Sequence, residues 1–399
     1  MSIGNNHNFS FSDIIAYFCI VFASYVALDE QLNSYALFMA IPVAFCICFL
    51  SYDTLSNNKS LKILLTLYIW LAFCSLFSLN STAANAELQK VLGCFILSYT
   101  VASLAQKRVN IPWLYILYCL LLIFAWRYAN EHIIDDIIFG EDRLNDDILN
   151  ANHLAYYTFY VTISVYILGD IIKTSVIRRI FRILFWGTLV LSFYTAIFTA
   201  SRQVMMIQIP LFFSLMVIRY LMNTDYSLWL RSVIILFGII ASIYLYNDQG
   251  ASIYDNSLLQ ERSSTKVEDD DRARIAEEAI ELAKEHPIVG YGPGNAMYNI
   301  STKHFTHNTF LELLVNSGII GMAIFVWLII SFLKTQYQRW RETKDRLFFF
   351  FLIFGVFWTI DQVFYVFYAD LWLISFFILI SAHSDIYYKD YHKRLCITH

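Results

Sequence analysis

The chain has 399 residues, of which 58% are hydrophobic and 18% aromatic, while only 15% are charged and the formal net charge is −4. Soluble domains carry roughly 45–50% apolar and about 25% charged residues, so this composition excludes a soluble globular protein and indicates a polytopic membrane protein. No Arg- or Lys-led signal peptide with a small-residue cleavage site opens the sequence, so we expect the first apolar stretch to be a retained anchor.

A hydrocarbon core about 30 Å thick is crossed by roughly 17–25 apolar residues in helical conformation. The apolar stretches predict an all-α fold with twelve spans. In chain order these are 12–28, 34–51, 62–79, 88–105, 110–126, 153–169, 180–200, 203–222, 228–246, 309–333, 346–366 and 368–383.

Basic residues mark the inner side of a membrane protein. Eighteen of the 28 Lys and Arg residues fall in alternate connections and the C-terminal tail, whereas the short connections 29–33, 80–87 and 361–370 carry none. We therefore expect both termini to be cytoplasmic. None of the seven cysteines lies in a predicted outer loop, so no disulfide framework is indicated.

Two outer segments are polar. Segment 127–152 carries seven acidic residues and is either a solvated loop or a rim that meets a sugar. In the loop 247–308, apolar residues recur at helical spacing after Asp269–Asp271 and stop before Pro287, which predicts an amphipathic helix at the membrane surface over roughly 272–285. Arg272 and Arg274 fall in its first turn, where an anion binds well; the alternative is pairing with Asp269–Asp271 or Glu278.

Gly290, Gly292 and Gly294 follow in the sequence VGYGPGN. No Lys-Ser/Thr pair follows for a P-loop and no strand precedes for a dinucleotide-binding turn. A tight structural turn that lets the backbone approach a ligand or a helix fits better.

Arg202 stands in FTASRQ, between two predicted spans with hardly any loop, on the outer side. Charges at this depth usually face an internal cavity with a partner, and a guanidinium matches phosphate oxygens. The alternative is an arginine that snorkels to the interface. Asp361 and Asp370 flank the last outer turn and are candidate salt-bridge partners.

The sequence KHFTHNTFLELLVNSGIIG (303–321) places two histidines and an asparagine at the mouth of an apolar helix. A histidine near neutral pH serves as a general base. His304 and His307 lack the acidic ligand pattern of a metal hydrolase, and a zinc site needs at least three protein ligands, so we expect no metal. Gly318 and Gly321 are expected to allow close helix packing.

Four motifs in this order resemble the O-antigen ligase and O-antigen polymerase family of bacterial envelope-glycan enzymes. They are TASR at 199–202, a long outer loop, Arg272-x-Arg274 leading to HPIVGYGPG at 286–294, and HNTFLELL at 307–314 followed by GIIG at 318–321. Two positions depart from the family pattern: Gln203 stands where Gly is frequent, and Asn316 stands where an acidic residue is common.

The resemblance implies a membrane glycosyltransferase of the GT-C-like class that needs no metal and no cofactor. It implies undecaprenyl-diphosphate-linked oligosaccharide or polysaccharide as donor, at the periplasmic face of the bacterial inner membrane. His307 would take the proton from the acceptor hydroxyl, and Arg202, Arg274 and Arg272 would stabilise the departing diphosphate. Asn308 and Glu312 would orient His307, and Ser201 would lie in the substrate site, with His304 a solvated neighbour. Alternatively, Glu312 is a buried polar group of the helix with a structural role only.

A polymerase is favoured over a ligase that transfers the polysaccharide to lipid A core, and a flippase of lipid-linked glycans is the alternative from another class. The expected organisation is 1–246 with nine spans, 247–308 as the periplasmic loop, and 309–399 with three spans and the tail, forming one integrated membrane domain. Expected partners are the lipid bilayer, a chain-length regulator and other envelope-glycan assembly proteins, with no nucleic acid.

Overall fold

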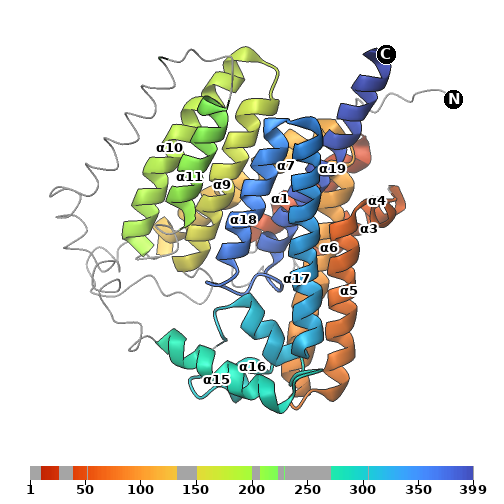
Figure 1. Ribbon diagram of the computed structural model, residues 1–399, viewed down its shortest axis with the longest axis vertical. Helices are drawn as coiled ribbons and strands as arrows, with labels where there is room; N and C mark the ends of the chain where they lie inside the picture. The colour runs from red at the N-terminus through yellow and green to blue at the C-terminus, as the bar shows by residue number, and fades with distance from the viewer. Residues whose placement is uncertain are drawn as a thin grey trace. The chain divides into compact units, whose positions relative to one another are not determined.

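The computed structural model describes residues 10–26, 39–51, 53–132, 151–199, 207–222, 229, 271–303 and 305–398. All regular secondary structure in these ranges is helical, with no β-strand, which confirms the predicted all-α class (Figure 1). The chain divides into two compact units. Residues 1–114, 267–342 and 358–399 form the first, and residues 115–266 and 343–357 form the second.

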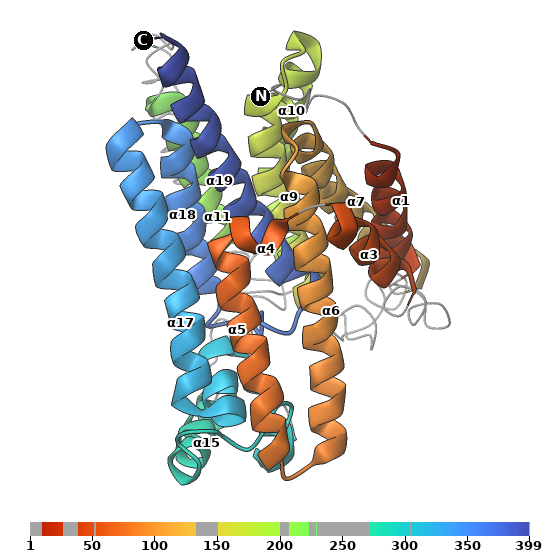
Figure 2. The same cartoon turned by 90° about the vertical axis from the view of Figure 1, so that its right-hand side faces the viewer.

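The first unit is built on the hairpin of α5 (Lys59–Cys74) and α6 (Ser81–Ala105), which Figure 2 shows side by side. Asparagine side chains begin both helices. Asn58 Oδ1 accepts from the Leu61 N–H at 2.8 Å and Asn80 Oδ1 from the Ala83 N–H at 3.2 Å, which satisfies amide groups that have no partner inside the helix. Around this hairpin lie α1 (Phe11–Val26), α3 (Ile41–Ser51), α4 (Thr54–Asn57), α17 (Thr309–Thr343) and α19 (Leu371–Thr398).

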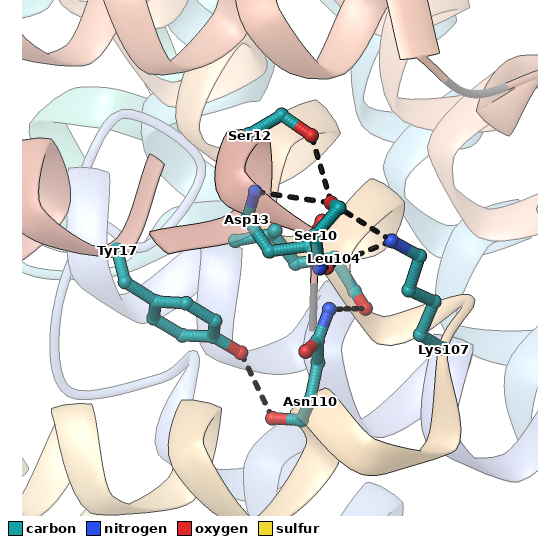
Figure 3. A network of polar contacts seen from close by, with 7 residues as sticks. All are labelled: Ser10, Ser12, Asp13, Tyr17, Leu104, Lys107 and Asn110. Atoms are coloured by element: carbon teal, nitrogen blue, oxygen red, sulfur yellow. Dashed lines mark hydrogen bonds and ion pairs between the residues drawn. The ribbon is translucent and has the colours of Figure 1, made fainter. Parts of the chain in front are cut away.

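A buried ion pair fixes α1 to the end of α6. Lys107 Nζ lies 2.8 Å from Asp13 Oδ2, and the Asp13 side chain is fully buried. Lys107 also donates to Ser10 Oγ at 3.0 Å, and the Tyr17 hydroxyl donates to the Asn110 carbonyl at 2.9 Å, as Figure 3 shows. Because a charge removed from water is tolerated only when it is paired, this contact makes the position of α1 specific.

The second unit contains most of α7 (Ile111–His132), with α9 (Ala151–Ile171), α10 (Ser175–Thr199) and α11 (Ile209–Met216), which continues into a π-helical turn, Val217–Leu221. Arg219 is buried there. Its guanidinium lies 4.1 Å from the Tyr166 ring centre and 3.3 Å from Asp170 Oδ1, and it donates to the Tyr166 carbonyl. A cation at the C-terminal end of α9 also complements the helix dipole.

Five helices within the described ranges are long and apolar enough to cross a membrane: Lys59–Phe77, Ser81–Ala105, Arg108–Arg127, Thr309–Thr343 and Leu371–Cys396. Shorter apolar helices occupy Phe11–Val26, Ile41–Leu50 and Ile209–Tyr220. The chain is therefore that of an integral membrane protein. The count of twelve spans stays a prediction, and the predicted span 228–246 lies, apart from residue 229, outside the described residues.

Two helices continue beyond the spans predicted within them. The tenth was expected to stop at 333 and the twelfth at 383, whereas α17 continues to Thr343 and α19 to Thr398. The extensions are polar and are joined to each other by hydrogen bonds. Arg339 of α17 donates to Asp385 of α19 at 2.6 Å and to Ser384 at 2.8 Å. Hydropathy detects only the apolar portion of such a helix. The eleventh predicted span, 346–366, is α18 (Arg346–Asp361), which ends five residues sooner.

The amphipathic helix predicted at 272–285 is α15 (Asp271–Glu285). Its apolar side packs on residues of its own unit, because Ile275 and Ala279 form one buried cluster with Tyr291, Ala296, Ile300 and Val315. α15 and the short α16 (Ala296–Asn299) lie next to the turn between α5 and α6 in both views (Figures 1 and 2). Placement of α15 at the membrane surface stays a prediction.

Candidate active site

The helix α17 is broken at Gly318, whose φ of 67° and ψ of −172° are outside the helical region. The segment after α15 supplies the hydrogen bonds that the break removes. Ile319 N–H donates to the Pro287 carbonyl at 2.8 Å, and Tyr291 N–H donates to the Val315 carbonyl at 2.8 Å. The prediction that Gly318 serves helix–helix packing is therefore wrong: an added side chain there would overlap the Ile288 carbonyl, so this glycine admits the backbone of the loop.

All three glycines of the 290–294 segment adopt left-handed backbone conformations, with φ values of 68°, 94° and 70°. Each also lies against another element. A Cβ on Gly292 would be 2.6 Å from the Ser78 Cβ, and one on Gly294 would be 2.8 Å from the Ala83 carbonyl oxygen. The predicted tight turn with close approach to a helix is confirmed, because only glycine meets both conditions.

Asn295 locks this turn onto the α5–α6 hairpin. Its Oδ1 accepts from the Asn80 N–H at 2.9 Å, and its Nδ2 donates to Ser78 Oγ at 2.7 Å and to the Pro293 carbonyl at 2.9 Å. The side chain is 1% exposed, so every polar atom is satisfied in place of water. The glycine-rich turn is thus fixed to the connection between α5 and α6.

His307 lies immediately before α17 in a left-handed backbone conformation, with φ of 54°. Such a conformation in a residue other than glycine costs of the order of 1–3 kcal/mol and persists only where the surroundings hold it. The imidazole is half-buried, with its ring centre 4.3 Å from that of Phe305. Phe305 in turn meets Tyr365 edge to face at 6.2 Å. One side of the imidazole is therefore packed, and the ring keeps some exposure.

Asn308 and Glu312 hold the turn on either side of His307. Asn308 Oδ1 accepts from the backbone N–H groups of Phe310 and Leu311 at 2.9 and 3.2 Å, the bonding of a helix N-cap. Glu312, 5% exposed, accepts from the Thr306 N–H at 2.9 Å. Glu312 thus bonds the backbone of the residue before His307, whereas Asn308 bonds the first turn of α17. The orienting role predicted for both residues, and contact of either with substrate, stay predictions.

The connection between α18 and α19 closes the other side of this turn. Thr309 N–H donates to the Gln362 carbonyl at 2.9 Å, and the Thr309 hydroxyl donates to the Tyr365 carbonyl at 2.7 Å. Asp370, predicted as a partner of Arg202, accepts from the N–H groups of Trp372 and Leu373 at 3.1 and 3.0 Å, so it caps α19. Asp361 is fully buried at the end of α18.

Arg272 and Arg274 lie in the first turn of α15, as predicted, and Arg274 is exposed. Glu278, one turn later, accepts from the N–H and hydroxyl of Ser301 at 2.8 and 2.6 Å. These bonds hold the pKa of Glu278 below its ordinary value, and the nearby charge of Arg274 adds to the effect. The same bonds tie α15 to the segment that runs into His307.

Two predicted site residues, Arg202 and Ser201, lie outside the described residues, and so do the predicted bystander His304 and the Gln203 departure. Asn316, the second departure from the family pattern, lies in α17 and is fully buried. Its amide donates to Glu312 Oε1 at 3.0 Å and to the Tyr368 hydroxyl at 3.3 Å. In the described part of the chain, no three His, Cys, Asp or Glu side chains gather as a metal site would require.

Sequence reasoning missed Asn295, Tyr368, and Glu87 of α6, which makes a side-chain hydrogen bond with Tyr368. They come from separate segments and belong to no motif, so only their burial and hydrogen bonds in the structure reveal them. Asn295 was the last residue of the glycine-rich segment, and its polar side chain inside a turn was the one available signal.

The region around His307 is similar to a known protein family. Residues 187–326 match the family model described as O-antigen ligase, and no curated protein matches the chain. The matched range runs from the middle of α10 to the middle of α17 and includes the glycine-rich turn and His307. It confirms the resemblance to the O-antigen ligase and polymerase family, whose members are enzymes of the glycosyltransferase type.

Proposed function

We propose that this chain, which matches the O-antigen ligase family over residues 187–326, is a polymerase-type glycosyltransferase of a bacterial surface polysaccharide. It transfers a growing glycan from undecaprenyl diphosphate to the glycan of an acceptor at the periplasmic face of the inner membrane. His307 is its catalytic base. Both termini of the chain lie in the cytoplasm.

The observation that carries the proposal is the state of His307. Its backbone is left-handed, one face of its ring is packed on Phe305, and Asn308 and Glu312 bond the backbone of the turn that carries it. Strained, over-determined residues of this kind gather at functional sites. A half-exposed imidazole is also the side chain that gains and loses a proton near neutral pH.

In the proposed reaction an acceptor hydroxyl attacks the anomeric carbon of the donor. The new C–O bond forms as the bond from that carbon to the diphosphate oxygen breaks. The hydroxyl proton passes to His307, and undecaprenyl diphosphate leaves with the electron pair. Arg202, Arg274 and Arg272 stabilise the charge that develops on the diphosphate, a type of contribution that is usually the largest single one.

A ligase is the second candidate, because the matching family model carries that description. It would use the same base and the same donor, and would differ in the acceptor, lipid A core in place of a carrier-linked repeat. Loss of the two activities leaves different products. A strain without a polymerase keeps a core that bears one repeat unit, whereas a strain without a ligase accumulates carrier-linked polymer and shows bare core.

The test replaces His307 with alanine in a strain whose only copy is the variant, with protein amount measured in the membrane fraction. His392→Ala is the matched control, because His392 is a partly exposed histidine near the C-terminal end of α19 whose side chain contacts Glu342. We expect His307→Ala to abolish long surface glycan and His392→Ala to leave it unchanged. Full-length glycan in the His307→Ala strain contradicts the assignment, and transport of carrier-linked glycan without a new glycosidic bond indicates a flippase.

A further inference from the structure

A chain of buried polar side chains runs from α6 to the turn that contains His307. It begins at Glu87, whose side chain is 12% exposed. The Tyr368 hydroxyl makes a side-chain hydrogen bond with Glu87 and is the next member of the chain. Tyr368 accepts from Asn316 Nδ2 at 3.3 Å, and the same amide group donates to Glu312 Oε1 at 3.0 Å. All four residues belong to the first compact unit.

The direction of each hydrogen bond in this chain is fixed. Asn316 uses both of its amide hydrogens, one toward Glu312 and one toward Tyr368, and its Oδ1 accepts from the Ala296 N–H at 2.8 Å. Tyr368 lies in the connection before α19 and is fully buried. A tyrosine hydroxyl carries its proton at neutral pH, so in its hydrogen bond with the Glu87 carboxylate Tyr368 is the donor. The two carboxylates are therefore the terminal acceptors of one oriented network.

The network ends on the backbone of the His307 turn. Glu312 Oε2 accepts from the N–H of Thr306, the residue before His307, at 2.9 Å. The Thr306 hydroxyl donates to the carbonyl of Asn308, the residue after it, at 2.9 Å. A change in the rotamer of Glu312 releases the Thr306 amide, and with it the left-handed conformation of His307.

We propose that Tyr368 and Glu87 are positioning residues for His307, acting through Asn316 and Glu312. The inference rests on the proposed function, in which His307 is the base. Tyr368 keeps the Asn316 amide turned toward Glu312, and Glu87 keeps the Tyr368 hydroxyl turned away from it. Neither residue touches the reacting atoms.

The test compares Tyr368→Phe with Tyr17→Phe. Both variants delete one tyrosine hydroxyl from the same unit, and Tyr17 donates to a backbone carbonyl far along the chain from the His307 turn, as Figure 3 shows. Purified full-length protein in proteoliposomes is given carrier-linked glycan extracted from a strain that lacks this protein. Initial rates over a range of donor concentrations then separate kcat from KM.

For Tyr368→Phe we expect kcat to fall about tenfold while KM stays within about twofold, because a misplaced base slows chemistry without weakening donor binding. Hydrogen–deuterium exchange of the peptide that contains Thr306 should accelerate. Tyr17→Phe should change neither. Equal kcat values for the two variants, or a Tyr368→Phe effect confined to KM, overturns the inference, as does unchanged exchange at Thr306.

Glu87 is tested by two substitutions. Glu87→Gln keeps an oxygen that accepts from Tyr368, so it should retain most of kcat, whereas Glu87→Ala should resemble Tyr368→Phe. Equal losses in the two variants would overturn the role of Glu87 as a hydrogen-bond acceptor. His307→Ala in the same assay distinguishes failure of the proposed function from failure of the positioning network. An active His307→Ala protein refutes the proposed function. An inactive His307→Ala protein together with a Tyr368→Phe protein of normal activity refutes the positioning network alone.

Discussion

Gly318→Ala tests whether the break in α17 is a built feature of the site. Gly318 has φ of 67° and ψ of −172°, a region that only glycine visits at low cost, and an alanine there costs about 1–3 kcal/mol. The new Cβ would also overlap the Ile288 carbonyl and lie 2.7 Å from the Val289 nitrogen. The loop must then retreat. It would lose the bonds Ile319 to Pro287 and Tyr291 to Val315, each worth about 1 kcal/mol.

The sum is a loss of about 3–5 kcal/mol, of the size seen for other strained or disrupted buried sites. Gly187→Ala is the matched control, since Gly187 lies inside α10 and an added Cβ there meets nothing within 4 Å. Alanine in a helix interior is better than glycine by about 0.5–1 kcal/mol. Both variants are unfolded by heat in one detergent, with activity measured in parallel. If Gly318→Ala is as stable as Gly187→Ala, the loop does not depend on this glycine and the reasoning is refuted.

Three further outcomes are expected. Lys107→Met removes the cation that pairs with the buried Asp13 carboxylate and should destabilise the protein by about 3–5 kcal/mol, much of which Asp13→Asn in the same chain restores; a thermal unfolding curve checks both, and a neutral single variant contradicts the contribution of this ion pair. Asn308→Ala removes the cap of α17 and should cost about 1 kcal/mol, whereas Asn308→Asp should cost less; equal unfolding temperatures for the two would argue against a cap. Glu278 has a pKa below its ordinary 4.5 because Ser301 donates to it, so its contribution to stability is complete above that value and is lost as pH falls through the lower folded pKa. The stability difference between the wild type and Glu278→Gln should therefore shrink on acidification, and a difference that grows contradicts this sign.

Hydropathy predicted the helices that are formed by uninterrupted apolar stretches. α5, α6 and α7 appear near their predicted positions because an uninterrupted apolar stretch has few other ways to satisfy its backbone in lipid. The ends of α17 and α19 were missed for the opposite reason. Past Lys334 the sequence is polar, and the helix continues because Arg339 and Asp385 pair across the two extensions, which no local pattern records.

The part of the candidate site whose residues lie close together in the sequence was predictable. His307, Asn308 and Glu312 stand within six residues of one another, and the glycines at 290, 292 and 294 announce a turn by composition alone. Gly318 was misread, since GIIG in an apolar helix has the spacing of a helix-packing motif. Its left-handed conformation is set by the backbone of Ile288, thirty residues earlier in the chain. Glu87 and Tyr368 reach the same network from α6 and from the connection before α19, so sequence spacing carries no sign of them.

The central claim is that His307 takes the proton while a new glycosidic bond forms. The most direct measurement supplies purified protein in proteoliposomes with carrier-linked glycan and follows two products together, elongated glycan and released undecaprenyl diphosphate. The wild type should form both in equal amounts, and His307→Ala should form neither while His392→Ala behaves as the wild type. Elongated glycan from His307→Ala at the wild-type rate would contradict the account.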